Sequence, residues 1–184
     1  MDIAQSLEER AKVHWFAMRA YKCENRVEEE LRKVSDLGYF IPKHYEIRTY
    51  HGVKSRRLVP VIPNLIFVHA SHIQIIKFKE RCNYLQFMMW EKSTGKEYIT
   101  IPDNQMDNFI KVASLQVEDT IYYKPEEINL RKGTHVCIHG GELDGVHGFF
   151  MRVKGKRNRR LVVLLEGLMA ITAEVHPDLI EVLD

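Results

Sequence analysis

The sequence predicts an α+β protein in two parts, an α/β sandwich with a mixed sheet followed by a small five-stranded β-barrel. Strand-like and helix-like segments alternate over the first 115 residues in the order β-α-β-β-α-β-β-α, which is typical of a sheet covered by helices. Seven of the ten glycines then fall in the last 55 residues. They separate short apolar runs there, as turns separate the strands of a small barrel.

The chain opens with a predicted strand and helix. Residues 13–19, VHWFAMR, are apolar and aromatic enough for a central strand. Residues 24–35 follow as a helix, because Val27, Leu31 and Val34 recur at a spacing that places them on one helical face. Acidic residues in the first half of this helix and basic residues in the second half suit the helix dipole.

Residues 39–58 predict a long hairpin. Residues 39–50 alternate well enough for a strand, residues 51–55 form a polar turn, and the returning strand begins at Arg56. The hairpin carries a concentration of positive charge at its tip or flank. Its basic residues are Arg48, Lys54, Arg56 and Arg57.

The most apolar stretch of the first part is residues 56–70, which Pro60 and Pro63 interrupt. Because proline cannot donate to a strand ladder, the segment before Asn64 must be an edge, a bend or a bulge. Residues 65–70, LIFVHA, are typical of a buried strand. A bent segment of this kind either leaves one or two large side chains at the surface, as a docking patch, or belongs entirely to the core.

Residues 71–79 predict a short helix with Ser71 as N-cap, and two strands follow at residues 84–90 and 96–101. Pro102 then opens an amphipathic helix. We therefore expect a tail at residues 1–12, a first domain at 13–115, an acidic linker at 116–129 and the barrel at 130–184. Residues 161–171 could also be drawn as a helix, but the Val162-Val163 pair and Gly167 favour strands.

Composition limits the class of protein. No apolar run approaches the roughly 18 residues of a membrane span, and the polar N-terminus is not a signal peptide. Three scattered cysteines make no disulfide framework, so we expect a cytoplasmic protein. Residues 13–115 hold 16 Lys and Arg against 11 Asp and Glu, an excess that permits contact with a polyanion.

No catalytic motif is present, so we expect neither an enzyme nor a cofactor. The best metal hypothesis rests on His135, Cys137 and His139, which fall on one face of a predicted strand with His147 nearby. The apolar residues between them explain the strand without a metal. We therefore expect no metal site.

Two motifs resemble the NusG family of transcription factors. A strand containing Trp15, an amphipathic helix, a basic hairpin and the run Pro63-Asn64-Leu65-Ile66-Phe67-Val68 are similar to the NusG N-terminal (NGN) domain. The Pro-Asn pair resembles the specialised paralogues of the RfaH and UpxY type, whereas Leu65 and Leu143 depart from the usual aromatic residues. The glycine-rich part resembles the KOW motif, KGxxVxIxxGxxxGxxG, at Lys132, Gly133, Val136, Ile138, Gly141, Gly145 and Gly148.

The resemblance implies a monomeric elongation or antitermination factor. Its NGN domain would bind the clamp helices of the RNA polymerase largest subunit, bridge to the opposite lobe, and suppress pausing or termination. Its KOW domain would recruit a small-subunit ribosomal protein or Rho. No membrane is implied. The alternative is a ribosome-associated or RNA-binding KOW protein. The implied polymerase-binding residues are Ile62, Leu65 and Pro63, with Phe67 and Trp15 behind them in the core.

Nucleic acid, including non-template DNA, is an expected second contact. Its candidates are basic residues of the first domain, although three glutamates interleave with those on the helix, and a solvated helix face is the alternative. Basic residues 154–160 of the barrel are either an RNA contact or a solubilising turn. The nucleic-acid candidates are Lys22, Arg26, Arg32, Lys33, Arg56 and Arg57, and the KOW partner-binding candidates are Ile138, Leu143, Val146 and Phe149.

Overall fold

A computed structural model describes residues 10–93, 95–115 and 120–183. The chain divides into two compact units, Met1–Pro102 and Asp103–Asp184, which are described separately below. This division falls before the helix that the sequence placed in the first domain. Most of the expected N-terminal tail and residues 116–119 of the expected linker lie outside the described residues. No helix in the described part of the chain has both the length and the hydrophobicity of a membrane span.

The sheet of the first unit is antiparallel throughout its described pairings, with the order β2-β5-β1-β6 and β9 beside β1. The expectation of a mixed sheet is therefore wrong, because apolar patterns identify strands but not the direction in which they pair. The central strand is the one that the sequence predicts to be central. The strands are β1 (Val13–Ala20), β2 (Gly38–Phe40), β5 (Leu65–Ser71), β6 (Leu85–Phe87) and β9 (Thr100–Ile101).

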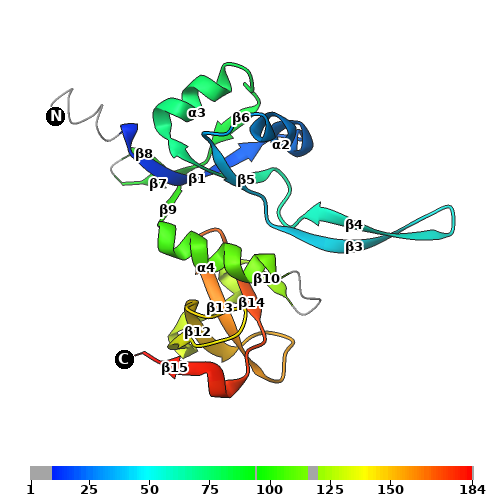
Figure 1. Cartoon of the computed structure of the whole chain (residues 1–184), viewed down its shortest axis with the longest axis vertical. Helices are drawn as coiled ribbons and strands as arrows, with labels where there is room; N and C mark the ends of the chain where they lie inside the picture. The colour runs from blue at the N-terminus through cyan, green and yellow to red at the C-terminus, as the bar shows by residue number, and fades with distance from the viewer. Residues whose placement is uncertain (1–9, 94, 116–119, 184) are drawn as a thin grey trace. The chain divides into compact units, whose positions relative to one another are not determined.

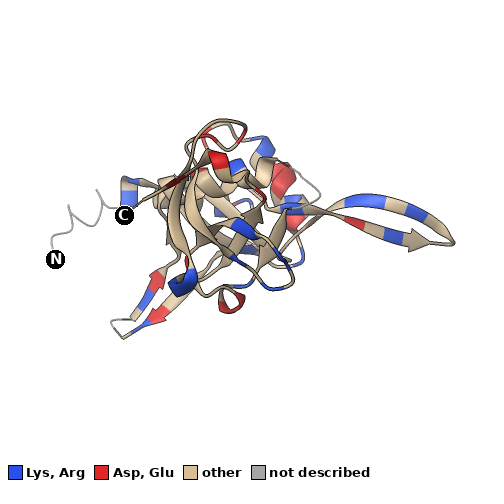
Figure 2. Cartoon of the chain, turned by 90° about the horizontal axis from the view of Figure 1, so that it is seen from below, with Lys and Arg blue, Asp and Glu red and all other residues tan. Residues whose placement is uncertain are grey.

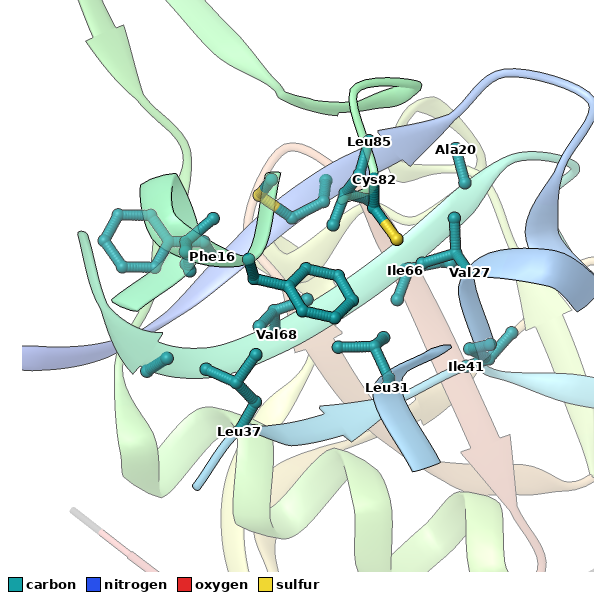
Figure 3. Close-up of a cluster of buried hydrophobic side chains, with 14 residues drawn as sticks. Phe16, Ala20, Val27, Leu31, Leu37, Ile41, Ile66, Val68, Cys82 and Leu85 are labelled. Atoms are coloured by element: carbon teal, nitrogen blue, oxygen red, sulfur yellow. The ribbon is translucent and has the colours of Figure 1, made fainter. Parts of the chain in front are cut away.

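Two helices, α2 (Glu24–Arg32) and α3 (His72–Lys79), supply side chains to the core on one face of this sheet. Figure 3 shows Val27 and Leu31 of α2 pointing toward Phe16 and the side chains of β5. The predicted N-cap of α3 is confirmed, because the Ser71 side chain accepts from the Gln74 backbone N–H in a capping box. The two helices and the sheet thus form two packed layers around one core.

Two hairpins stand apart from the sheet as separate two-stranded ribbons. The larger one pairs β3 (Lys43–Tyr50) with β4 (Val53–Pro60) and extends away from the sheet of its own unit (Figure 1). The smaller one pairs β7 (Met89–Lys92) with β8 (Gly95–Tyr98). The sequence predicted one strand over residues 39–50. It breaks between β2 and β3 instead, where Pro42 cannot donate to a ladder.

The second unit holds a six-stranded antiparallel sheet of order β10-β14-β13-β12-β11-β15. The five strands predicted from its apolar runs are confirmed, including the stretch that could have been a helix. The expected closure into a barrel goes beyond the pairings found among the described residues. The strands are β10 (Ile121–Tyr123), β11 (Thr134–Ile138), β12 (His147–Arg152), β13 (Arg159–Leu165), β14 (Met169–Ala173) and β15 (Ile180–Val182).

Helix α4 (Asp103–Ser114) packs against β13 and β14 of this sheet (Figure 1). Its apolar face, Met106, Phe109 and Val112, is buried. The sixth strand, β10, lies within the expected linker and pairs with β14. The polar and acidic residues around Ile121–Tyr123 hide this strand, which is too short to show a pattern. The place of α4 has a different cause, because its apolar face packs on strands that lie far along the chain. Short 3-10 helices complete the unit at Pro125–Glu127, Leu130–Lys132 and Pro177–Leu179.

Candidate functional site

The turn that follows β4 is held by Asn64. Asn64 has φ 70°, a left-handed conformation that Asn tolerates better than most residues. Its side-chain Oδ1 accepts a hydrogen bond from the Lys22 backbone N–H at 2.6 Å, and its own N–H donates to the Glu24 carboxylate at 2.5 Å. Its carbonyl accepts from the Ala20 N–H at 2.8 Å. Three bonds therefore fix the Pro63-Asn64 turn to the junction between β1 and α2.

The structure brings together the residues expected to dock on the polymerase, but it exposes only part of the set. Pro63 is exposed and Ile62 is half-buried beside it. Leu65 is 3% exposed, so the expectation that it lies at the surface is wrong for this structure. Phe67 and Trp15 are buried, as expected of core residues.

These three buried side chains lie on one face of the sheet. In the β1–β5 register Arg19 pairs with Leu65 and Ala17 with Phe67. Alternation places these residues and Trp15 on the face opposite the α2 and α3 core. Two-sided burial of β5 was not predicted in detail, because periodicity does not distinguish a half-buried strand from a fully buried one when every residue is apolar.

The basic candidates on α2 are largely paired with acidic neighbours. Arg32 contacts the Glu28 carboxylate at 2.7 Å, and Lys33 contacts Glu30 at 2.6 Å. Glu28 also contacts Lys43 at 2.7 Å. Burial opposes ionisation of Glu28, but hydrogen bonds from Lys43 and Arg32 hold its pKa below its ordinary value. These ion pairs favour the interpretation of this side of α2 as a solvated helix face rather than a nucleic-acid contact.

The other two candidates on this part of the chain are exposed and differ in their neighbours. Lys22 lies in the turn held by Asn64 and has φ 53°. The Arg26 guanidinium lies over the Tyr84 ring at 5.2 Å. Arg26 is thus held by an aromatic neighbour, and Lys22 lies outside the helix in the turn.

The β3–β4 hairpin carries the remaining candidates, Arg56 and Arg57, on exposed strands. Figure 2 shows Lys and Arg along both strands of this hairpin. The Arg56 guanidinium lies 3.9 Å from the centre of the Tyr45 ring. Sequence analysis identified the charge but not the exposed apolar side chains beside it. Alternation within the strands was the signal that could have revealed them, since successive side chains point to opposite faces.

The expected partner-binding side chains of the second unit lie mostly inside it. Ile138 and Val146 are fully buried and Leu143 is 7% exposed, so these three partner-binding candidates do not form an open surface in this structure. Phe149 is half-buried. The loop that carries Leu143 and Val146 is tied to α4, which sequence analysis had assigned to the other domain.

Two hydrogen bonds join α4 to that loop. The Asn108 side chain accepts from the His147 N–H at 3.2 Å, and Lys111 donates to the Asp144 carbonyl. Within the loop, the Gly140 N–H donates to the Asp144 carboxylate at 2.6 Å. The helix therefore occupies one side of the surface that a partner would need.

The basic cluster at residues 154–160 is not a uniform surface patch. Arg160 is fully buried, where its Nε donates to the Thr172 hydroxyl at 3.1 Å and its guanidinium contacts Glu174 at 2.5 Å. Arg160 is therefore a structural residue of the sheet. The turn beside it carries Lys154, Lys156 and Arg157, which are exposed or half-exposed, as a solubilising turn requires.

The metal-ligand candidates are rearranged relative to the sequence hypothesis. Donor atoms of Cys137, His139 and Glu181 lie within 4.8 Å of one another, with Cys137 paired to Glu181 across β11 and β15. His139 Nε2 lies 2.5 Å from the Glu181 carboxylate, a hydrogen-bonding contact that explains this pair without a metal. His135 instead packs its ring against Phe149 at 5.3 Å. Glu181 was missed because only strand pairing brings it beside Cys137.

A solved structure entitled "Domain interaction in Thermotoga maritima NusG" is similar over 95% of this chain and 99% of that chain, at 20% sequence identity and a TM-score of 0.46. A comparison with curated protein sequences found no match. The family model described as "Transcription termination factor nusG" matches residues 13–110, which is more than half of the chain. The chain therefore belongs to the NusG family, whose members are non-enzymatic transcription factors.

Proposed function

We propose that this NusG-family protein is an elongation and antitermination factor that acts in the cytoplasm on RNA polymerase. Membership of the family implies polymerase binding. The proposed contact is the clamp-helix pair of the largest subunit, with Ile62 and Pro63 at its centre. The observation that supports this choice is the turn itself: an exposed proline and a half-buried isoleucine are presented on a backbone fixed by three hydrogen bonds at Asn64.

The physical argument is that a pair of helices offers an amphipathic ridge, which a protein grips with apolar side chains held in a fixed geometry. Full burial of one aliphatic side chain contributes roughly 1.5–3 kcal/mol before the cost of association. Such a contribution is that of a hot spot in a larger, reversible interface. Leu65, Phe67 and Trp15 are buried in this structure and would support this contact from behind Ile62 and Pro63.

The rest of the proposal concerns the consequences of docking. A second contact with the opposite lobe would keep the cleft closed around the nucleic acids, and pausing and termination would then decrease. The second unit would recruit another factor, a small-subunit ribosomal protein or Rho. Because α4 is bonded to the loop that carries Leu143 and Val146, recruitment through those residues requires α4 to move.

The family match also bears on the domain limits. It extends to residue 110, past the division between Pro102 and Asp103, so the first two turns of α4 belong to the matched segment by sequence, whereas the whole helix belongs to the second unit by packing. We propose that the family domain spans residues 13–115. The family match and the division into compact units place its end differently only because α4 packs on the second unit.

The test is capture of purified core RNA polymerase by the immobilised full-length protein. Ile62→Asp is expected to reduce capture at least about tenfold, because a carboxylate cannot be buried against an apolar ridge without a large penalty. Ile73→Asp is the matched control, since Ile73 is an exposed isoleucine on α3, and it should leave capture unchanged. Circular dichroism of both variants verifies the fold.

A transcription assay on a template with a pause site and a terminator then separates the functions. The wild-type protein should increase read-through, and Ile62→Asp should not. Equal capture of wild type and Ile62→Asp would overturn the docking surface. Absence of polymerase capture by the wild type, together with tight binding to small ribosomal subunits or RNA, would establish the alternative of a ribosome-associated or RNA-binding protein.

A further inference from the structure

Helix α3 carries apolar side chains on two sides. Ile75 and Phe78 are buried in the core of the first unit, together with side chains from α2 and the sheet. Ile73 and Ile76 lie outside that core and are 50% and 45% exposed. A helix that covers a sheet needs one apolar side, and its outer side is ordinarily polar. The outer side of α3 therefore presents an apolar surface that the fold of one chain does not use.

The two exposed isoleucines begin a ridge along the outer side of the helix. Residues three and four positions apart lie on the same side of a helix. The ridge that follows from this spacing, here called the α3 ridge, ends at the C-cap residue and consists of Ile73, Ile76, Lys77 and Glu80. All four side chains are exposed. The ridge is thus apolar in its first half and charged in its second half.

A groove of about 570 Å³ adjoins this ridge, between α3 and the segment that follows α2. Figure 1 shows both helices on the same side of the sheet of this unit. Buried or half-buried apolar side chains line the groove from both segments: Val34, Leu37 and Phe78. Ile73 and Lys77 belong both to the ridge and to the lining of the groove. An apolar ridge and an apolar groove therefore lie next to each other on one surface.

The charged residues of the groove include both signs. Two are acidic and two are basic: Asp36, Glu80, Lys77 and Arg81. In the described part of the chain, no ion pair involves Asp36, Lys77 or Glu80. The Arg81 guanidinium lies 6.0 Å from the centre of the Phe78 ring. The surface thus offers acidic and basic side chains to a partner in equal number.

We propose that a second copy of this chain covers this surface, in a two-fold dimer in which the α3 ridge of each copy enters the groove of the other. A two-fold interface requires a patch that is complementary to itself. Here the apolar ridge matches the adjoining groove, as in the packing of ridges into grooves between helices, and acidic and basic groups face their opposites. A polyanion or an acidic segment would instead require an excess of cations, which this surface lacks.

The dimer should be weak and reversible. Its contact consists of one helix and one adjoining segment, and is smaller than the roughly 800 Å² per partner that stable complexes bury. A dissociation constant above about 1 µM is therefore expected. This state differs from the monomer that the family resemblance implies, and it is reached only when the protein is concentrated.

Sedimentation equilibrium of the full-length protein, at loading concentrations of about 5–500 µM and without polymerase, measures the association. The apparent mass should rise from that of one chain toward that of two. Ile76→Asp should weaken association at least about tenfold, because it places a carboxylate in the apolar contact. Ile47→Asp is the matched control, since Ile47 is 70% exposed on the β3–β4 hairpin, and it should change the dissociation constant less than about twofold. A wild type that keeps the mass of one chain throughout, or equal association of both variants, would overturn the proposal.

Variants with segregated charges test whether two copies of the same surface meet. Lys77→Glu with Arg81→Glu makes the charged residues of the groove all acidic, and Asp36→Lys with Glu80→Lys makes them all basic. Each double variant alone should stay monomeric, because like charges then face one another across the two-fold axis. An equimolar mixture of the two should dimerise at least as strongly as the wild type. A mixture that stays monomeric would overturn the two-fold arrangement.

The control for net charge is Lys54→Glu with Arg57→Glu, which makes the same charge change on exposed positions of the β3–β4 hairpin. Mixed with the basic variant, it should associate more weakly than the acidic variant does. If it associates equally well, net charge explains the attraction and the assignment to α3 is wrong. Circular dichroism of every variant verifies the fold.

The result is separable from the polymerase docking test. Ile73→Asp, the control in that test, should weaken self-association while leaving polymerase capture unchanged, because Ile73 lies on the α3 ridge. A wild type that captures polymerase but stays monomeric would contradict only the dimer. A wild type that dimerises but does not capture polymerase would contradict only the docking proposal.

Discussion

Replacement of Asn64 tests whether the turn beside Ile62 is held as the structure describes. Asn64→Ala removes the acceptor of the Lys22 N–H, a loss of roughly 1 kcal/mol. It also leaves a residue with no compensating polar group at φ 70°, which costs roughly 1–2 kcal/mol. The expected decrease in the free energy of unfolding is therefore about 2–3 kcal/mol.

Asn64→Gly separates the two contributions. Glycine adopts the left-handed conformation without strain, so only the hydrogen bond is lost, together with roughly 0.4–1 kcal/mol from the greater freedom of the unfolded chain. The expected decrease is roughly 1–2 kcal/mol, smaller than for alanine. The backbone bonds of Asn64 to Glu24 and Ala20 remain available in both variants.

Urea denaturation followed by tryptophan emission measures these changes in the first unit alone, because Trp15 and Trp90 both belong to it. Asn83→Ala, an exposed position of the same unit, is the control and should stay within about 0.5 kcal/mol of the wild type. If alanine at position 64 proves as stabilising as asparagine, or more stable than glycine, the account of the turn is wrong. Polymerase capture should follow the same order, since the turn positions Ile62.

Three further outcomes are expected. Gly148→Ala should destabilise the second unit by about 1–3 kcal/mol in thermal denaturation followed by circular dichroism, because the added Cβ would lie 2.6 Å from the Val162 carbonyl oxygen; an unchanged melting temperature would contradict this packing. The pKa of Glu28 is lower in the folded state, so its contribution to stability is complete above about pH 4.5 and is lost as the pH falls through the pKa of the folded state. Glu28→Gln should therefore flatten the decrease in urea midpoint below about pH 4.5. An identical pH profile in the variant and the wild type would refute the ion-pair assignment. Purified protein should carry far less than one zinc ion per chain by elemental analysis, because His139 is already paired with Glu181; stoichiometric zinc that Cys137→Ser removes would instead identify a metal site.

Much of the secondary structure could be predicted because local signals and burial agree. A signal within a few residues of sequence was enough to identify the β1 strand, the apolar face of α2 and the Ser71 capping box. The strands around Gly167 were also identified correctly, since valine pairs and a glycine with φ 72° fit a hairpin better than a helix.

The parts that could not be predicted depend on contacts between distant segments. Leu65 follows Asn64 in an apolar run, and nothing local shows that its face of the sheet is buried. The packing of α4 on β13 joins residues far apart in the chain. An amphipathic pattern predicts that one face of a helix is buried, but not which surface buries that face. Glu181 reaches Cys137 only through the pairing of the last strand with β11. The resemblance to a family supplied candidate residues, but not their exposure.

The position of α4 in the chain has a consequence during synthesis. The helix ends at Ser114, whereas β13, which its apolar side packs on, begins at Arg159, so the ribosome must add about 45 residues before that partner exists. At bacterial-type elongation rates this interval is roughly 2–9 s, during which the apolar side of the nascent helix has no native cover from β13. A trigger-factor-type holdase would find its substrate in this window, and slowing translation between codons 115 and 159 should increase the aggregated fraction of newly made protein.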